Sequence, residues 1–349
     1  MDRHAAGQLQ ARAARKLKQR PRLGKAALGP RAVAEYIGAH FRTPSHRPLA
    51  PMTVQHPEIR PEQSIELLKQ LHILTRDGKL NQDSRRKLKQ VYHLYQFIEP
   101  LLAEALAERP DIQLVDHGAG KSYLGFILYD LFFKQHAPGG RIHGIETRDE
   151  LVMSSRRLAD KLGFAAGMRF HNLTVAESIS SERLPERIDV VTALHACNTA
   201  TDDAIRFALE KRARFIVLVP CCQAEVAAVL RKNKQRQLKN SLTELWRHPI
   251  HTREFGSHVT NVLRCLQLES HGYQVNVTEL VGWEHSMKNE LIIASDRGLP
   301  RGRPSARLRE LLQTLGLEEL GERFFAGEPQ SGTRSVAVPA PDADADAAG

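Results

Sequence analysis

One stretch decides the fold: Leu114-Val115-Asp116-His117-Gly118-Ala119-Gly120-Lys121-Ser122. Apolar residues that end in an acid predict a buried strand, and the helical pattern that resumes at Tyr123 predicts a helix directly after the turn. Glycine at positions 118 and 120 lets the backbone turn sharply and lets a ligand approach without a Cβ in its way. A strand, a glycine turn and a helix start together predict a nucleotide-type site.

The spacing of the glycines excludes two common nucleotide motifs. A dinucleotide fingerprint, G-x-G-x-x-G, would need a small residue where Tyr123 stands. A P-loop needs four residues between its glycines, and here only Ala119 separates Gly118 from Gly120. The pattern that remains is acid-x-Gly-x-Gly.

Short apolar segments alternate with helical ones on both sides of this turn, which predicts a doubly wound α/β domain with seven strands. Before these strands, one helical pattern follows Pro61 and a second covers 88–106. Strands are predicted at 112–116, 141–146, 168–171, 188–193, 214–219, 274–281 and 290–294. Helices are predicted at 121–134, 149–162, 200–210, 222–245 and 257–270, with a helix pair in 304–325.

The acid-x-Gly-x-Gly turn resembles motif I of class I S-adenosylmethionine-dependent methyltransferases. The resemblance implies a Rossmann-like sheet and S-adenosylmethionine as cofactor, with the methionine part at the glycine turn and the ribose held by the acid that ends the second strand. Ser122 stands where the common pattern has a third glycine, which leaves the exact path of the loop open. The residues that the resemblance assigns to the cofactor are Asp116, Gly118, Gly120, Glu146, Asn172 (or His171) and Leu194.

Four further segments resemble one branch of that family: 189–203, 217–225, 245–251 and 282–290, within a region that runs from Lys87 to Asp296. The branch is a little-characterised bacterial group. It shares its methyltransferase domain with eukaryotic methyltransferase-like proteins, some of them labelled ribosomal RNA adenine dimethylase domain-containing. The branch commonly has Asp where this chain has Asn198, which removes a carboxylate base from the exit of the fourth strand.

Polar side chains and thiols follow the fourth and fifth strands, and the ends of neighbouring parallel strands meet at one edge of a sheet. We therefore expect His195, Cys197 and Asn198 to face Pro220, Cys221 and Cys222 across one catalytic pocket.

Three chemistries are open for that pocket. It could orient a nucleophilic nitrogen in line with the methyl group, with His195 or a backbone carbonyl near Pro220 binding the amine. A thiolate of Cys197 or Cys222 could add to C6 of a pyrimidine, as in RNA cytosine-C5 methyltransferases, with His195 as the nearby base. His195 and the thiols could bind zinc, although their spacing matches no common tetrahedral site. Apolar packing is the ordinary alternative for all of these cysteines.

The charge balance of the chain favours an anionic partner. Fifty Lys and Arg oppose forty Asp and Glu, for a formal net charge of +10. We expect RNA to bind through two clusters inside the folded region and through the basic N-terminal arm, although solvated helix faces are the alternative. The clusters are Arg85, Arg86, Lys87 and Lys89, and Arg231, Lys232, Lys234, Arg236 and Lys239. A protein or small-molecule methyltransferase, or a binding protein without turnover, are the other classes.

Both ends of the chain look different from its centre. We expect a mobile, basic, Pro-rich arm at 1–60, a helical extension at 61–110, the methyltransferase domain at 111–298, C-terminal helices at 299–327 and a disordered acidic tail at 328–349. Without an apolar run of membrane-spanning length we expect a cytoplasmic protein, with an organelle transit peptide as the alternative reading of the arm. Four cysteines are too few for a disulfide scaffold, and we expect reduced thiols.

Overall fold

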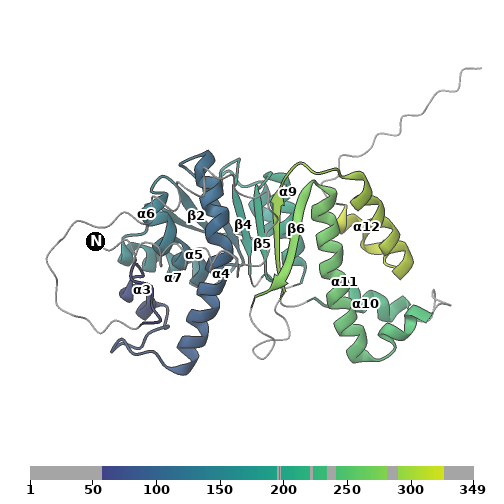
Figure 1. The fold of residues 1–349 in the computed structure, drawn as a ribbon, viewed down its shortest axis with the longest axis horizontal. Coiled ribbons are helices and arrows are strands. Elements are labelled where there is room, and N and C mark those ends of the chain that lie inside the picture. The colour runs from purple at the N-terminus through teal and green to yellow at the C-terminus, as the bar shows by residue number, and fades with distance from the viewer. Residues whose placement is uncertain are drawn as a thin grey trace, which may run out of the picture. The chain divides into compact units, whose positions relative to one another are not determined.

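A seven-stranded sheet organises the computed structural model, which describes residues 57–194, 196, 198–220, 223–233, 241–280 and 290–325. The strand order is β3-β2-β1-β4-β5-β7-β6, and helices lie on both faces (Figure 1). Strands β1 to β5 are parallel, whereas β7 runs antiparallel to both β5 and β6. The predicted doubly wound, Rossmann-like methyltransferase sheet is therefore confirmed.

All seven predicted strands occur within two residues of their expected positions. They are β1 (Gln113–His117), β2 (Arg141–Glu146), β3 (Met168–Asn172), β4 (Val190–Ala193), β5 (Phe215–Leu218), β6 (Tyr273–Glu279) and β7 (Glu290–Asp296). The central strands are buried over their whole length, as expected for parallel strands covered on both faces.

The helices cover the sheet from both sides. Phe207 of α9 packs into a core with Val115, Val191 and Ile216 of the sheet. On the opposite face, Phe126 of α5 contacts Phe170, with ring centroids 5.6 Å apart. The helical elements before β5 are α3 (Ile65–Gln70), α4 (Gln82–Glu108), α5 (Tyr123–Leu128), the π-helix η1 (Tyr129–Phe133), α6 (Lys134–His136), α7 (Asp149–Leu162), α8 (Val175–Ile179) and α9 (Thr199–Glu210). Those after it are α10 (Glu225–Asn233), η2 (Ser241–Trp246), α11 (Pro249–Ser270), α12 (Gly302–Leu315), η3 (Glu318–Leu320) and α13 (Gly321–Phe324).

The N-terminal extension joins the domain through a buried carboxylate. Asp130 in η1 is fully buried, and its Oδ2 accepts hydrogen bonds from the side chain of Gln63 and from the backbone N–H of Ser64. Lys134 provides a cation 3.5 Å from the other oxygen. These contacts fix the start of α3, because an unpaired buried carboxylate would be costly.

Two helix predictions are corrected by the structure. Within the helix predicted at 222–245, residues 225–233 form α10 and residues 241–245 belong to the 3₁₀ helix η2, whereas 234–240 lie outside the described residues. The helix predicted at 257–270 begins earlier, at Pro249, a residue suited to the first helical position. Gly256 lies inside this helix because α10 approaches it closely: a Cβ at 256 would lie 2.7 Å from the Cβ of Ala227.

Several predictions concern residues outside the described ranges. The basic arm up to 56, the acidic tail from 328 and the four catalytic candidates His195, Cys197, Cys221 and Cys222 belong to this group. The described residues from Arg60 onward belong to one compact unit, and the finer division at 110 and 298 stays a prediction. Within the described ranges, no helix combines the length and the apolar character that crossing a bilayer requires.

Candidate functional site

The glycine turn after β1 adopts the left-handed backbone that its sequence predicts. Gly118 and Gly120 have φ angles of 64° and 57°, and Ser122, the residue directly before α5, has a φ of 52°. The N–H of Ala119 donates to the carbonyl of Ile145 at the end of β2, over 3.0 Å. The turn is thereby fixed against the neighbouring strand, and no side chain projects from its two glycines.

Glu146, at the end of β2, lies directly beside the turn. Its Oε2 accepts the N–H of Gly120 over 2.9 Å, and its Oε1 accepts the backbone N–H and the Nε of Arg148 over 3.0 and 3.1 Å. Burial opposes ionisation of this carboxyl, but the hydrogen bonds from Arg148 and Gly120 outweigh burial and hold its pKa below the ordinary value. Glu146 is therefore an ionised acceptor, and the exposed side chain of Arg148 occupies part of its capacity.

Asp116 differs from Glu146 although both were assigned to the cofactor. Its side chain is only 4% exposed, and its Oδ1 accepts the hydroxyl of Thr192 on β4 over 2.6 Å. Burial raises the pKa of Asp116 to about 7, although the hydrogen bond from Thr192 acts in the other direction. The contact joins β1 to β4, and direct contact of Asp116 with a cofactor stays a prediction.

The other two cofactor candidates lie at the same edge of the sheet. Asn172 ends β3, is exposed, and donates from Nδ2 to Asp149 at the start of α7 over 3.2 Å. Leu194 is half-buried in the bend after β4. His171, the alternative to Asn172, is instead buried against His143, with a ring nitrogen of each 3.2 Å apart. Of the two, Asn172 is the one whose side chain a ligand can reach.

One contact joins the segments that follow β4 and β5, and the predicted catalytic pocket between them stays a prediction. Asn198 follows β4, and its Oδ1 accepts the N–H of Ala224 in the loop after β5 over 3.3 Å. Pro220 is buried at the exit of β5. The thiolate and zinc hypotheses rest on His195, Cys197 and Cys222, outside the described ranges, and both stay predictions. Within those ranges no cluster of His, Cys, Asp and Glu is arranged to hold a metal ion.

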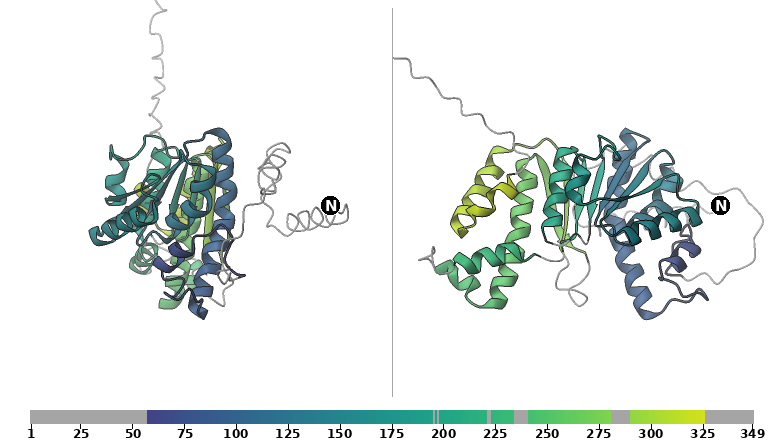
Figure 2. Two further views of the ribbon diagram at one scale, coloured as in Figure 1. Left: turned by 90° about the vertical axis from the view of Figure 1, so that its left-hand side faces the viewer. Right: turned by 180° about the vertical axis from the view of Figure 1, so that it is seen from behind.

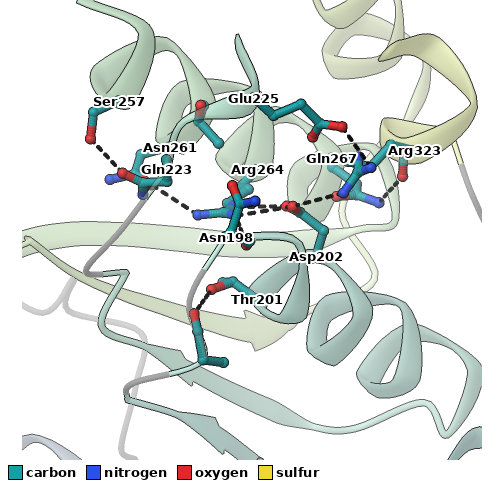
Figure 3. A network of polar contacts seen from close by, with 12 residues as sticks. Asn198, Thr201, Asp202, Gln223, Glu225, Ser257, Asn261, Arg264, Gln267 and Arg323 are labelled. Atoms are coloured by element: carbon teal, nitrogen blue, oxygen red, sulfur yellow. Dashed lines mark hydrogen bonds and ion pairs between the residues drawn. The ribbon is translucent and has the colours of Figure 1, made fainter. Parts of the chain in front are cut away.

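A buried polar network behind these exits was not predicted from the sequence (Figure 3). Arg264 of α11 forms a two-pronged ion pair with Asp202 of α9, with distances of 2.6 and 3.0 Å. It also donates to the carbonyl of Asn198 over 3.0 Å. Asn261, one helical turn earlier, connects to Gln223 in the loop after β5. The one available signal was the three-residue spacing of Asn261, Arg264 and Gln267 on the buried side of a helix.

The basic clusters lie on two helices. All four basic residues at the start of α4 are exposed, and Arg86 is 3.8 Å from Asp83. On α10, Arg231 and Lys232 are exposed, and Lys232 is 2.9 Å from a carboxylate oxygen of Glu319. Lys234, Arg236 and Lys239 lie outside the described residues.

These residues fit the cofactor that the glycine turn predicts. The left-handed turn carries no Cβ at Gly118 and Gly120, so a ligand can approach its backbone closely, and an ionised carboxylate beside it accepts hydrogen bonds from hydroxyl groups. Gly118 and Gly120 would accommodate the methionine part of S-adenosylmethionine, and Glu146 would hold the ribose hydroxyls.

Comparison with known sequences finds a family whose description is "Methyltransferase domain", matched by residues 86–229. A glutathione S-transferase C-terminal domain-containing protein from Mus musculus is 24% identical over 236 residues, which are 62% of this chain and 34% of the mouse protein. The protein of the same description from Homo sapiens is 24% identical over 170 residues, or 48% of this chain and 24% of the human protein. The chain thus spans about a third or less of the length of these relatives.

Solved structures with similar folds include three methyltransferases. Magnesium protoporphyrin IX methyltransferase from Synechocystis, with bound S-adenosylhomocysteine, is 14% identical, with a TM-score of 0.37, over 65% of this chain and 93% of the other. Precorrin-6y C5,15-methyltransferase from Geobacter metallireducens is 20% identical, with a TM-score of 0.33, over 53% of this chain and 79% of the other. An rRNA methylase from Streptococcus thermophilus is 10% identical, with a TM-score of 0.33, over 55% of this chain and 89% of the other. The bacterial branch with dimethylase-labelled relatives stays a prediction.

Proposed function

The chain carries a class I methyltransferase domain that uses S-adenosylmethionine, and from this premise we propose that it methylates a base in RNA. The acceptor would enter between the loops after β4 and β5, where Asn198 and Pro220 lie. His195, Cys197, Cys221 and Cys222 of the same two loops are the further candidates for contact with the base.

Charge at the edge of the sheet is the observation that carries this proposal. The first turns of α4 and the whole of α10 lie on the side of the sheet where β1 to β5 end (Figures 1 and 2). Each presents exposed basic side chains, four on α4 and two on α10. A nucleic-acid backbone carries several phosphates and can contact basic groups on both sides of a site at once, whereas a small molecule cannot.

The chemistry asks little of the protein beyond alignment. Bound S-adenosylmethionine supplies a methyl group already activated by its sulfonium. The glycine turn and Glu146 would fix one end of the cofactor, and the exits of β4 and β5 would hold the acceptor atom in line with the methyl group. In this proposal the basic helices position the RNA and do not take part in the methyl transfer.

The test is transfer of radiolabelled methyl groups into extract from a strain without this protein, followed by separation of RNA, protein and small molecules. We expect the label in RNA. Label confined to protein or small molecules would contradict the proposal, and an unlabelled extract together with intact cofactor binding would favour a binding protein without turnover.

Matched double variants test the role of charge. Arg86→Gln/Lys87→Gln and Arg231→Gln/Lys232→Gln each remove two exposed positive charges beside the site, and Arg212→Gln/Arg303→Gln removes two exposed ones elsewhere. We expect each of the first two variants to weaken RNA binding and to lower the slope of log affinity against log salt by about 1 to 2. The third should match the unaltered protein. Equal slopes in all four proteins would contradict binding through these helices.

A further inference from the structure

Asn198 holds a backbone conformation that side chains rarely adopt. Its φ of 54° and ψ of −123° lie in a region that favours glycine. Such a residue costs about 1–3 kcal/mol and persists only where its surroundings hold it. Asn198 directly precedes α9, so its conformation sets the direction in which the chain enters this helix from the loop after β4. In our proposed function this loop faces the acceptor.

The buried side chain of Arg264 contacts the backbone of Asn198. Its side chain is 1% exposed, and its Nη2 donates to the Asn198 carbonyl over 3.0 Å. The charge of Arg264 is balanced by Asp202, also buried, through two hydrogen bonds (Figure 3). A buried ion pair adds little net stability compared with apolar residues of similar volume. Stability alone therefore gives little reason for this pair.

The network continues from Arg264 to two other segments at the same edge. Nη1 of Arg264 is 3.4 Å from Oδ1 of Asn261, an atom that also accepts from the side chain of Gln223. Because Oδ1 takes both donors, Nδ2 of Asn261 points the other way and donates to Glu290, at the start of β7, over 2.7 Å. One helix thus ties together the exits of β4 and β5 and the entrance of β7.

We propose that Arg264 is a positioning residue for methyl transfer: it fixes the loops after β4 and β5 relative to each other, and so aligns the acceptor with the methyl group. A displacement of about 1 Å at a reacting centre can cost about a hundredfold in rate. The proposal rests on the methyltransferase activity and not on the identity of the acceptor as RNA.

The test separates positioning from stability. Arg264→Met and Asp202→Leu each break the ion pair and should lower Tm. Asp202→Leu leaves the buried Arg264 without an ionic partner, and Arg264→Met leaves the buried Asp202 with only the Arg323 guanidinium, 3.5 Å away. The double variant replaces both charges by apolar groups and should recover most of the lost Tm. We expect its kcat to stay about 10- to 100-fold low, with affinity for S-adenosylmethionine, measured by calorimetry, within about twofold of the unaltered protein. The acceptor is whichever extract fraction takes up label from the unaltered protein.

Hydrogen exchange gives a second measurement that needs no acceptor. We expect faster amide exchange in the segments after β4 and β5 of the double variant, even at restored Tm. The matched control is Glu104→Leu/Arg214→Met, which removes a half-buried ion pair of 2.6 Å between α4 and the start of β5 and should change neither kcat nor exchange near the site. If the Asp202/Arg264 double variant recovered Tm, kcat and exchange together, the pair would be structural only and the proposal wrong. If no fraction takes up label, exchange alone decides the proposal.

Discussion

The two halves of the sheet edge are held together differently. In the cofactor half, the glycine turn and Glu146 belong to one βαβ unit, and backbone N–H groups supply part of the contacts. In the acceptor half, side chains from the two helices α9 and α11 and from two loops hold the exits of β4 and β5, and Arg264 is 66 residues from Asn198 in the sequence. The cofactor half is therefore a local construction, whereas the acceptor half depends on packing across the domain.

The contact between Asp116 and Thr192 connects the two halves. Removing the ionisable carboxyl of Asp116 should have the largest effect, and the effect is on the stability of the fold. Burial raises the pKa of Asp116 from 3.8 to about 7. Because the folded pKa is the higher one, Asp116 favours folding fully below pH 3.8, and this contribution is lost as the pH rises to about 7. Asp116→Asn, which retains an oxygen for the Thr192 hydroxyl, should escape that loss, which is on the order of 4 kcal/mol.

The measurement is chemical unfolding of both proteins at pH 5 and pH 8. We expect the stability of the variant relative to the unaltered protein to be greater at pH 8. The buried histidines His117, His143 and His171, whose pKa values are lowered by burial, are present in both proteins and cancel in the difference. A difference independent of pH would show that Asp116 ionises freely in the folded protein.

Loss of Glu146 should weaken cofactor binding and leave the acceptor half unchanged. Glu146→Ala removes an ionised acceptor, and lost hydrogen bonds to a charged group are each worth about 1.5–3 kcal/mol. We expect the affinity for S-adenosylmethionine in calorimetry to fall roughly 10- to 100-fold, with the acceptor KM unchanged at saturating cofactor. Glu150→Ala, an exposed carboxylate four residues later, is the control. Unchanged affinity in Glu146→Ala would remove this residue from the cofactor site.

The same contrast explains which features the sequence could predict. Buried strands and the glycine turn have local signatures, so short patterns predict β1 and the turn at Gly118 and Gly120, whereas the role of Glu146 comes from the family resemblance and stays a prediction. The Arg264 network has no local signature, because Arg264 meets Asp202, and Asn261 meets Gln223, only when α9 and α11 pack beside the sheet. The predicted helix at 257–270 starts one residue after Gly256, whereas α11 continues through this glycine, where the absence of a Cβ makes room for Ala227. Contacts between segments that are distant in the sequence are therefore the part of the structure that the sequence alone did not predict.

The smallest expected effect sharpens the picture of the cofactor half. Arg148 uses both oxygens of Glu146, at 3.1 Å from Nε and 3.2 Å from Nη2, and ribose hydroxyls would compete for the same oxygens. The Arg148 side chain is 60% exposed, so solvent screens the ion pair and breaking it costs little. Arg148→Gln should therefore bind S-adenosylmethionine up to about fivefold more tightly, whereas Arg157→Gln, the same charge change at an exposed position of α7, should leave affinity unchanged. Weaker binding by Arg148→Gln alone would show that Arg148 itself holds the cofactor, and that the cofactor half includes a cation.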